Sequence, residues 1–437
     1  MPLAPPYDEA YDEGSRPRAQ YAELLGALEH PAELAERVEE RLRGRGVSFG
    51  DDVFALDPIP RVLTTAEWSE LQVGVAQRIR ALDAFVADVY GEQRSLAEEV
   101  VPRAAVEGSP HYEPAMRGAR VSRWIAFAGL DVVRCPDGRF RVIEDQVRMA
   151  SGLAYAVAAR ETLRDLLPVD PPRSDLTLAY GELALALQDT SAVAEPQIVL
   201  LSDGPEVAAW WEHSVLGREL CAPVVTLADL EVRDGRVVAW VGGRRRTVDV
   251  VYHRTNEDRF SGTALELLIE PCARGTVTVV NAPGAGVADD KLVHPYVDEL
   301  VRFFLDEEAL LPSIPSRPAG DVSDLEGFVV KPRGEMGGED VVIWSDADEP
   351  TRRRLREAIE AGPDQFVAQE AVALSVHPTV CDGKLEPRHI DLRPYAVLDS
   401  DGVRVLPGGI SRVALERGSM VVNSGRGGGA KDTWVLT

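Results

Sequence analysis

Two carboxylates that lie thirteen positions apart, Asp131 and Glu144, have the chemistry of magnesium ligands. Apolar runs at residues 125–133 and 140–144 favour two strands, and the Pro, Asp and Gly of residues 135–138 favour a hairpin turn between them. Acids on adjacent antiparallel strands can share one Mg²⁺, whose remaining positions take phosphate oxygens. The pair alone is also compatible with solvated hairpin acids, so its interpretation depends on the surrounding sequence.

A lysine at the end of an apolar run, Lys331, indicates a site for phosphate. A buried lysine is costly without an anionic partner. The run continues into a loop with Gly337 and Gly338, whose backbone N–H groups can close over phosphates. This K-P-x-x-x-x-G-G pattern is not a Walker loop. The residues by themselves therefore predict magnesium and phosphate binding and no particular reaction.

The elements that must position these residues can be read from hydrophobic patterns. Apolar residues at every third or fourth position over residues 65–91 predict an amphipathic helix, which we interpret as scaffold. Apolar runs at 197–201, 248–252 and 277–281 predict buried strands, and their alternation with helical segments favours a small parallel sheet. From residue 326 onward, strands are expected to dominate.

Composition narrows the classes of partner. With 72 acidic and 47 basic side chains, the 437-residue chain carries a formal charge of −25, which disfavours nucleic acid and anionic membranes. A small-molecule partner is expected. The four cysteines form no C-x-x-C pair, and no apolar run is long enough for a membrane span. The N-terminal residues do not resemble a secretory signal, so a cytoplasmic location is expected.

Residues 144–152, Glu-Asp-Gln-Val-Arg-Met-Ala-Ser-Gly, resemble the E-D-N-x-R-x-P-S-G segment of the circularly permuted ATP-grasp family. Gln146 stands where that family has Asn, and Ala150 stands where it has Pro. Glutamine keeps the carbonyl oxygen of the asparagine but extends it by one methylene. The two metal acids also have the spacing seen in D-alanine ligase-type ATP-grasp enzymes.

Further motifs follow in the order expected for that family. Residues 281–291 match an N-x-P…D-K segment, and residues 365–370 resemble the hinge that contacts adenine and ribose. Residues 423–430 resemble the N-x-x-x-G-G-x-A stretch of the related glutathione synthetase-like ATP-grasp enzymes. In ordinary ATP-grasp enzymes the lysine segment precedes the metal acids, whereas here the acids come two hundred residues earlier. The resemblance extends over about residues 11–435 and implies circular permutation.

The resemblance implies an α/β (α+β) fold, a circularly permuted ATP-grasp with a small parallel-sheet pre-grasp domain and a helical N-terminal portion. Residues 1–190 would hold the N-terminal helices and the metal-binding hairpin. Residues 195–315 would form the pre-grasp domain, and residues 325–437 the lid and the C-terminal grasp strands. The last strands, near residues 419–435, should then lie close to the hairpin of Asp131 and Glu144.

The resemblance also implies ATP and Mg²⁺ as cofactors and assigns roles to residues. The expected metal ligands are Asp131, Glu144 and Gln146. The expected ATP-binding residues are Lys291, Lys331, Gly337, Gly338, Gln369 and Glu370. Contacts to substrate or acyl phosphate are expected from Arg148, Ser151, Asn423, Gly428 and Gly429, and the expected catalytic cations are Arg393, Arg412 and Lys431.

Three functions are compatible with these features. The first, which the resemblance implies, is a ligase that joins a carboxylate to an amine through an acyl phosphate. The second is a kinase that phosphorylates a small acceptor, and the third is a nucleotide-binding protein without catalysis, for which the replacement at Gln146 is the sequence hint. In the first two, cations and N–H groups must stabilise the transferring phosphoryl group.

Overall fold

A computed structural model describes residues 3–170, 176–255, 259–334, 341–422 and 428–436. At its centre lies a four-stranded antiparallel sheet in the order β20-β19-β4-β5, with β4 (Phe127–Arg134), β5 (Phe140–Gln146), β19 (Tyr395–Asp399) and β20 (Gly402–Val405). The predicted hairpin is confirmed, because β4 and β5 pair with Asp131 opposite Glu144 and an irregularity after Asp131.

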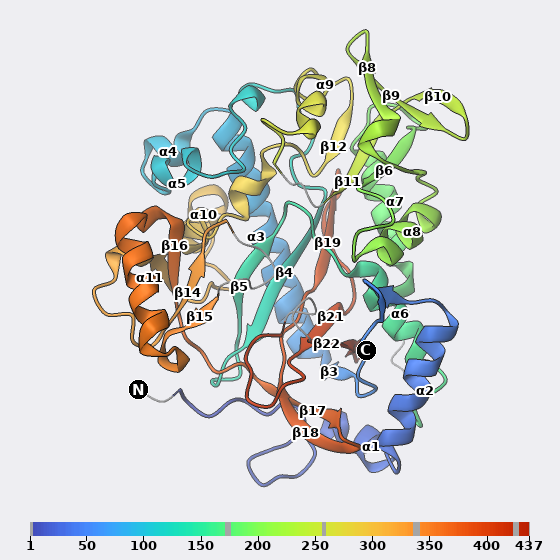
Figure 1. Cartoon of the computed structure of the whole chain (residues 1–437), viewed down its shortest axis with the longest axis vertical. Coiled ribbons are helices and arrows are strands. Elements are labelled where there is room, and N and C mark those ends of the chain that lie inside the picture. The colour runs from blue at the N-terminus through green and yellow to red at the C-terminus, as the bar shows by residue number, and fades with distance from the viewer. Residues whose placement is uncertain (1–2, 171–175, 256–258, 335–340, 423–427, 437) are drawn as a thin grey trace.

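The ends of the sequence meet at this sheet, as circular permutation requires. β19 pairs with β4, although more than 250 residues separate Tyr395 from its partner Gly129. Beside them lies a three-stranded sheet in the order β21-β22-β3, in which the last strand runs parallel to an early one (Figure 1). Its strands are β3 (Arg61–Leu63), β21 (Ile410–Val413) and β22 (Gly429–Val435).

A second antiparallel sheet faces the hairpin and carries Lys331. Its order is β13-β16-β14-β15, with β13 (Ser316–Pro318), β14 (Phe328–Pro332), β15 (Val342–Ile343) and β16 (Phe366–Glu370). Helix α11 (Glu349–Ala361) covers one face of this sheet, where Ile359 packs in one apolar cluster with Val330 and Ala368. Because side chains alternate along a strand, Lys331 points to the opposite face.

The predicted parallel sheet is also confirmed. Its order is β12-β11-β6-β7, with β6 (Ile198–Ser202), β7 (Val224–Val225), β11 (Val250–Arg254) and β12 (Thr278–Val280), all parallel. The helices near it are α7 (Ala179–Asp189) and α8 (Trp210–Glu219), and a small antiparallel sheet projects from its edge (Figure 1). That sheet consists of β8 (Leu230–Arg233), β9 (Arg236–Val241) and β10 (Arg244–Thr247).

The helix predicted at residues 65–91 is α3 (Thr65–Tyr90). Its buried stripe, including Leu71, Val75 and Ile79, shares one apolar core with Val132 of β4 and Val142 of β5. The scaffold interpretation is therefore confirmed. The other elements are α1 (Ala19–Gly26), α2 (Pro31–Gly44), α4 (Arg94–Ala97), α5 (Arg103–Glu107), α6 (Leu153–Leu163), α9 (Ile269–Ala273), α10 (Val297–Leu305), β1 (Ser48–Phe49), β2 (Asp52–Val53), β17 (Val376–Cys381) and β18 (Lys384–His389).

The start of α3 is fixed by a capping box. The hydroxyl of Thr64 accepts a hydrogen bond from the backbone N–H of Glu67, while the Glu67 carboxylate accepts one from the backbone N–H of Thr64. We expect Thr64→Ala to lower the free energy of unfolding by about 1 kcal/mol. Urea denaturation would measure this, and Val73→Ala on the exposed side of α3 is the control that should change stability less.

A buried histidine beside the parallel sheet predicts sensitivity to acid. His213 on α8 hydrogen-bonds Ser202 at 2.8 Å, and burial, helped by Arg254, lowers its pKa to about 3. The unfolded chain therefore binds the proton first as the pH falls below about 6.5. We expect this histidine to cost about 1.4 kcal/mol of stability per pH unit between roughly pH 6 and 4.

The measurement for this expectation is the free energy of unfolding as a function of pH. The free energy of unfolding of the His213→Gln variant should fall less steeply below pH ~6.5 than that of the parent protein. Replacement of the exposed His30 by glutamine should leave the slope of the parent protein unchanged. Equal slopes for all three proteins would contradict the assignment.

Among the described residues, no helix is both long enough and apolar enough to cross a membrane.

Candidate active site

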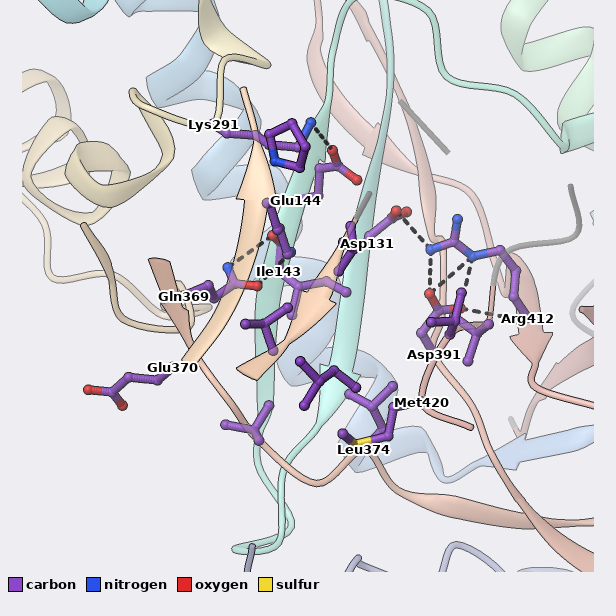
Figure 2. Close-up of a pocket in the computed structure, with 18 residues that line it drawn as sticks. Asp131, Ile143, Glu144, Lys291, Gln369, Glu370, Leu374, Asp391, Arg412 and Met420 are labelled. Atoms are coloured by element: carbon purple, nitrogen blue, oxygen red, sulfur yellow. Dashed lines mark hydrogen bonds and ion pairs between the residues drawn. The ribbon is translucent and has the colours of Figure 1, made fainter. Parts of the chain in front are cut away.

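The hairpin, the Lys331 sheet and the end of the chain enclose one cavity of about 150 Å³ (Figure 2). Its polar lining comes from segments far apart in sequence, while Val329, Ile343 and Val422 are among its apolar walls. The lining residues with polar or charged side chains are Asp131, Glu144, Lys291, Lys331, Gln369, Glu370, Asp391 and Arg412. All but Asp391 were expected as site residues from the sequence.

Lys331 is held in this cavity by its neighbour on β16. Its Nζ donates to Oε1 of Gln369 at 2.6 Å, and Gln369 Nε2 donates to the carbonyl of Ile143 and to Ser316 Oγ. Removal of the ammonium group from water lowers the pKa of Lys331 to about 8, although Glu144 acts in the opposite direction. Lys331 is thus a poorly hydrated cation that an anionic ligand would stabilise.

Glu144 and Lys291 form an ion pair on the other side of the cavity. Lys291 Nζ lies 3.3 Å from Glu144 Oε1, and the Glu144 side chain keeps 26% of its surface exposed. In Figure 2 the pair lies above Gln369, with both side chains at the cavity. An exposed carboxylate beside two lysines provides one oxygen ligand for a cation within reach of bound phosphate.

Asp131 is held differently, by two arginines. Arg393 donates to it through Nε at 2.7 Å and Nη2 at 2.9 Å, and Arg412 Nη2 lies 2.7 Å from Asp131 Oδ2. Arg412 also donates through Nε to Asp391, at 3.0 Å and 3.1 Å (Figure 2). Although burial raises the pKa of Asp131, the two arginines lower it to about 2.

The ion pairs of Asp131 determine which carboxylate oxygens remain available to a metal ion. Carboxylate oxygens suit Mg²⁺, and Asp131 and Glu144 face each other across β4 and β5. Asp131 already binds two guanidinium groups, so Glu144 is the more accessible ligand. In the described part of the chain, no three His, Cys, Asp or Glu side chains are grouped as a metal site. The residues therefore fit a Mg²⁺ that takes much of its coordination from phosphate oxygens.

Ser151 and Arg393 are brought together at the start of α6. The Ser151 carbonyl accepts hydrogen bonds from Tyr395 Oη at 2.9 Å and from Arg393 Nη1 at 3.3 Å. The next residue, Gly152, has φ +103°, and an added Cβ would lie 2.5 Å from the Tyr395 hydroxyl. Glycine is therefore required where this turn meets the central sheet.

Arg148 lies beside this region but outside the residues that line the cavity. Its Nη1 lies 2.6 Å from His111 Nε2, its Nε lies 3.4 Å from Asp289, and its backbone N–H donates to Asp289. Burial raises the pKa of Asp289 to about 7, although Arg148 opposes the shift. Contact between Arg148 and substrate stays a prediction.

Lys431, expected as a catalytic cation, does not join the site. Its buried Nζ forms an ion pair with Asp57 and donates to the Pro378 carbonyl at 3.1 Å. The register explains this, because Lys431 lies opposite Ser411 and so shares its face of the sheet, whereas Arg412 projects from the other face. Lys431 is therefore not among the residues that line the cavity, and a catalytic role for it stays a prediction.

The other expected residues are placed as follows. Gln146 ends β5, opposite Gly129 and two positions after Glu144. Gly429 begins β22, and Gly428, just before it, is buried; neither is among the lining residues. The chain end does reach the cavity through Met420, Val421 and Val422, which confirms the predicted proximity. Gly337, Gly338 and Asn423 lie outside the described residues.

Comparison with known proteins agrees with this arrangement. The family described as circularly permuted ATP-grasp type 2 matches residues 60–414. A Frankia alni protein with the provisional name glutamate–cysteine ligase 2-3 is 38% identical, over 98% of this chain and 54% of its own length. An uncharacterised Synechocystis protein is 34% identical, over 98% of this chain and 97% of its own length.

A solved structure shares the fold. It is an apo glutathione synthetase-like effector from Globodera pallida, with a TM-score of 0.63, 12% sequence identity, and coverage of 94% of this chain and 99% of its own. The chain spans about half the length of the two Frankia relatives it matches, which bear glutamate–cysteine ligase names.

Proposed function

Because the chain belongs to the circularly permuted ATP-grasp type 2 family, we propose that it is an ATP- and Mg²⁺-dependent ligase that joins a carboxylate to an amine. The observation that supports this most is the meeting of Lys331, Glu144 and Arg412 in one cavity, from three distant parts of the sequence. Phosphoryl transfer depends on such positioned charge more than on covalent chemistry by the protein.

In the proposed reaction a substrate carboxylate oxygen attacks the γ-phosphorus of ATP, and ADP leaves. The amine nitrogen then attacks the carbonyl carbon of the acyl phosphate, and inorganic phosphate leaves as the nitrogen gives up a proton. In this proposal Lys331 and Lys291 bind phosphate oxygens, and Gln369 and Glu370, at the end of β16, contact the adenosine. Bound Mg²⁺ would neutralise charge on the phosphates, with Glu144 as its main protein ligand.

In this proposal the two arginines that pair with Asp131 bind the acyl group of the substrate. Asp131 and Asp391 orient Arg393 and Arg412 by ion pairs at 2.7–3.0 Å. Fixed guanidinium groups bind a carboxylate or an acyl phosphate with little reorganisation. In the proposal Gln146 also contacts the metal ion, and Ser151 and Arg148 contact the substrate.

An ADP-release screen tests the function. Purified protein with ATP and Mg²⁺ would be offered pools of amino acids and small carboxylic acids, with glutamate and cysteine included because of the relatives' names. We expect ADP and phosphate only when carboxylate and amine are both present, and a condensed product in the mass spectrum. A stable phosphorylated product would instead indicate a kinase, and nucleotide binding without turnover a non-catalytic role.

A further inference from the structure

A second, much smaller cavity of about 10 Å³ is lined in part by Lys291 and Lys331. Glu144, Lys291 and Lys331 are among the residues that it shares with the larger cavity, and Asp145, Asp289 and His294 are among those that line only the smaller one. Its size corresponds to about one water molecule. Two ammonium groups line it beside the acids, and the described residues contain no group of three or more His, Cys, Asp and Glu side chains that could hold a metal ion.

His294 lines this small cavity and has one ring nitrogen without a hydrogen-bond partner among the described residues. The residue is only 5% exposed, and its Nε2 makes no hydrogen bond to any described residue. Its other nitrogen, Nδ1, lies 2.8 Å from Asp145 Oδ2. A buried ring nitrogen without a partner is costly, and each such case in a folded protein calls for a ligand or a water molecule.

The partner on Nδ1 determines what Nε2 can do. Asp145 also accepts hydrogen bonds from Arg78 at 2.6 Å and 2.8 Å. Arg78 thus donates to both oxygens of Asp145, the geometry of a guanidinium–carboxylate pair. A carboxylate only accepts hydrogen bonds, so the His294 tautomer with its proton on Nδ1 fits this contact, and in that tautomer Nε2 is an acceptor.

We propose that the small cavity binds one water molecule that links His294 to the nucleotide phosphates, which makes His294 a positioning residue for phosphate binding. This inference rests on the proposed function. One O–H of the water donates to His294 Nε2 and the other to a phosphate oxygen, while the water oxygen accepts from Lys331 or Lys291. His294 Nε2, the lysine and the phosphate oxygen then each have a hydrogen-bond partner. Asp145, itself held by Arg78, fixes the orientation of the His294 ring.

Two substitutions at position 294 distinguish the proposed positioning role of His294 from a role in packing. His294→Asn places an amide near Nδ1 and can still donate to Asp145, but it has no atom at Nε2. His294→Gln places its amide near Nε2. Replacement of the exposed His30 by asparagine is the matched control. Affinities for adenosine, ADP and a non-hydrolysable ATP analogue would be measured by calorimetry with Mg²⁺ present.

We expect His294→Asn to weaken ADP and ATP-analogue binding about 5- to 20-fold, with adenosine binding unchanged. His294→Gln should recover part of that loss, and the His30 variant should bind like the parent protein. A high-resolution crystal structure of the parent protein should show one ordered water between His294 Nε2 and the lysines.

Other outcomes would overturn the inference. If the parent protein binds ADP and His294→Asn binds it equally well, the proposed function stands and the role of His294 is lost. Equal weakening of all three ligands would make His294 a purely structural residue. Failure of the parent protein itself to bind ADP or the ATP analogue would instead refute the proposed function.

Discussion

Replacement of Glu144 by alanine should lower Mg²⁺-dependent turnover by about 10²- to 10³-fold, with little change in thermal stability. The Glu144 side chain is partly exposed and forms an ion pair with Lys291 at 3.3 Å, so its removal leaves no cavity in the apolar core. What is lost is the most accessible oxygen ligand for the metal ion that neutralises the phosphates. Turnover and apparent Mg²⁺ affinity would both be measured, once the screen has identified substrates.

The matched control for this change is Asp137→Asn, which removes an acid from the turn of the same hairpin. Asp137 pairs with Arg141 at 2.8 Å and is not among the residues that line the cavity. This variant should keep near-parental turnover and Mg²⁺ dependence. If Glu144→Ala also keeps them, Glu144 does not hold the metal, and its carboxylate serves only as the ion-pair partner of Lys291.

Local patterns in the sequence were sufficient for the hairpin and for α3. The turn residues at 135–138 and the apolar runs on either side of them favour a hairpin from local sequence alone, and the predicted pairing of Asp131 and Glu144 is confirmed. The helical period of α3 extends over 26 residues, which is long enough to outweigh local ambiguity. The order of the motifs then predicted the pairing of the chain's last third with its first.

The features of the site that the sequence did not reveal depend on contacts between segments that are far apart in the chain. Asp391 binds Arg412 and borders the cavity, but nothing local distinguishes it from other acids. His294 meets Asp145 across 149 residues, through a fold that the sequence indicates only in outline. Lys431 lies away from the cavity lining because the face it occupies depends on its register with Ser411, which local sequence does not encode.

Lys331→Met should weaken binding of ATP analogues by about 10- to 100-fold and should leave the ligand-free protein at least as stable as the parent. Lys331 Nζ donates to Gln369, and its pKa is lowered to about 8 because burial disfavours its charge. The ammonium group therefore opposes folding slightly and is stabilised only when an anion binds. Methionine keeps the length of the side chain and removes the charge.

Thermal shifts with and without the analogue would measure both effects, and Lys384→Met, at an exposed position on β18, is the control that should bind like the parent.

The lowered pKa of Lys331 also predicts that affinity for the ATP analogue depends on pH. Above pH ~8 the free protein loses the Lys331 proton, so affinity should fall as the pH rises from about 7.5 to 9.5. In Lys331→Met that part of the pH dependence should vanish. A variant with parental affinity and an unchanged pH profile would leave Lys331 as a structural lysine and remove the main support for nucleotide binding in this cavity.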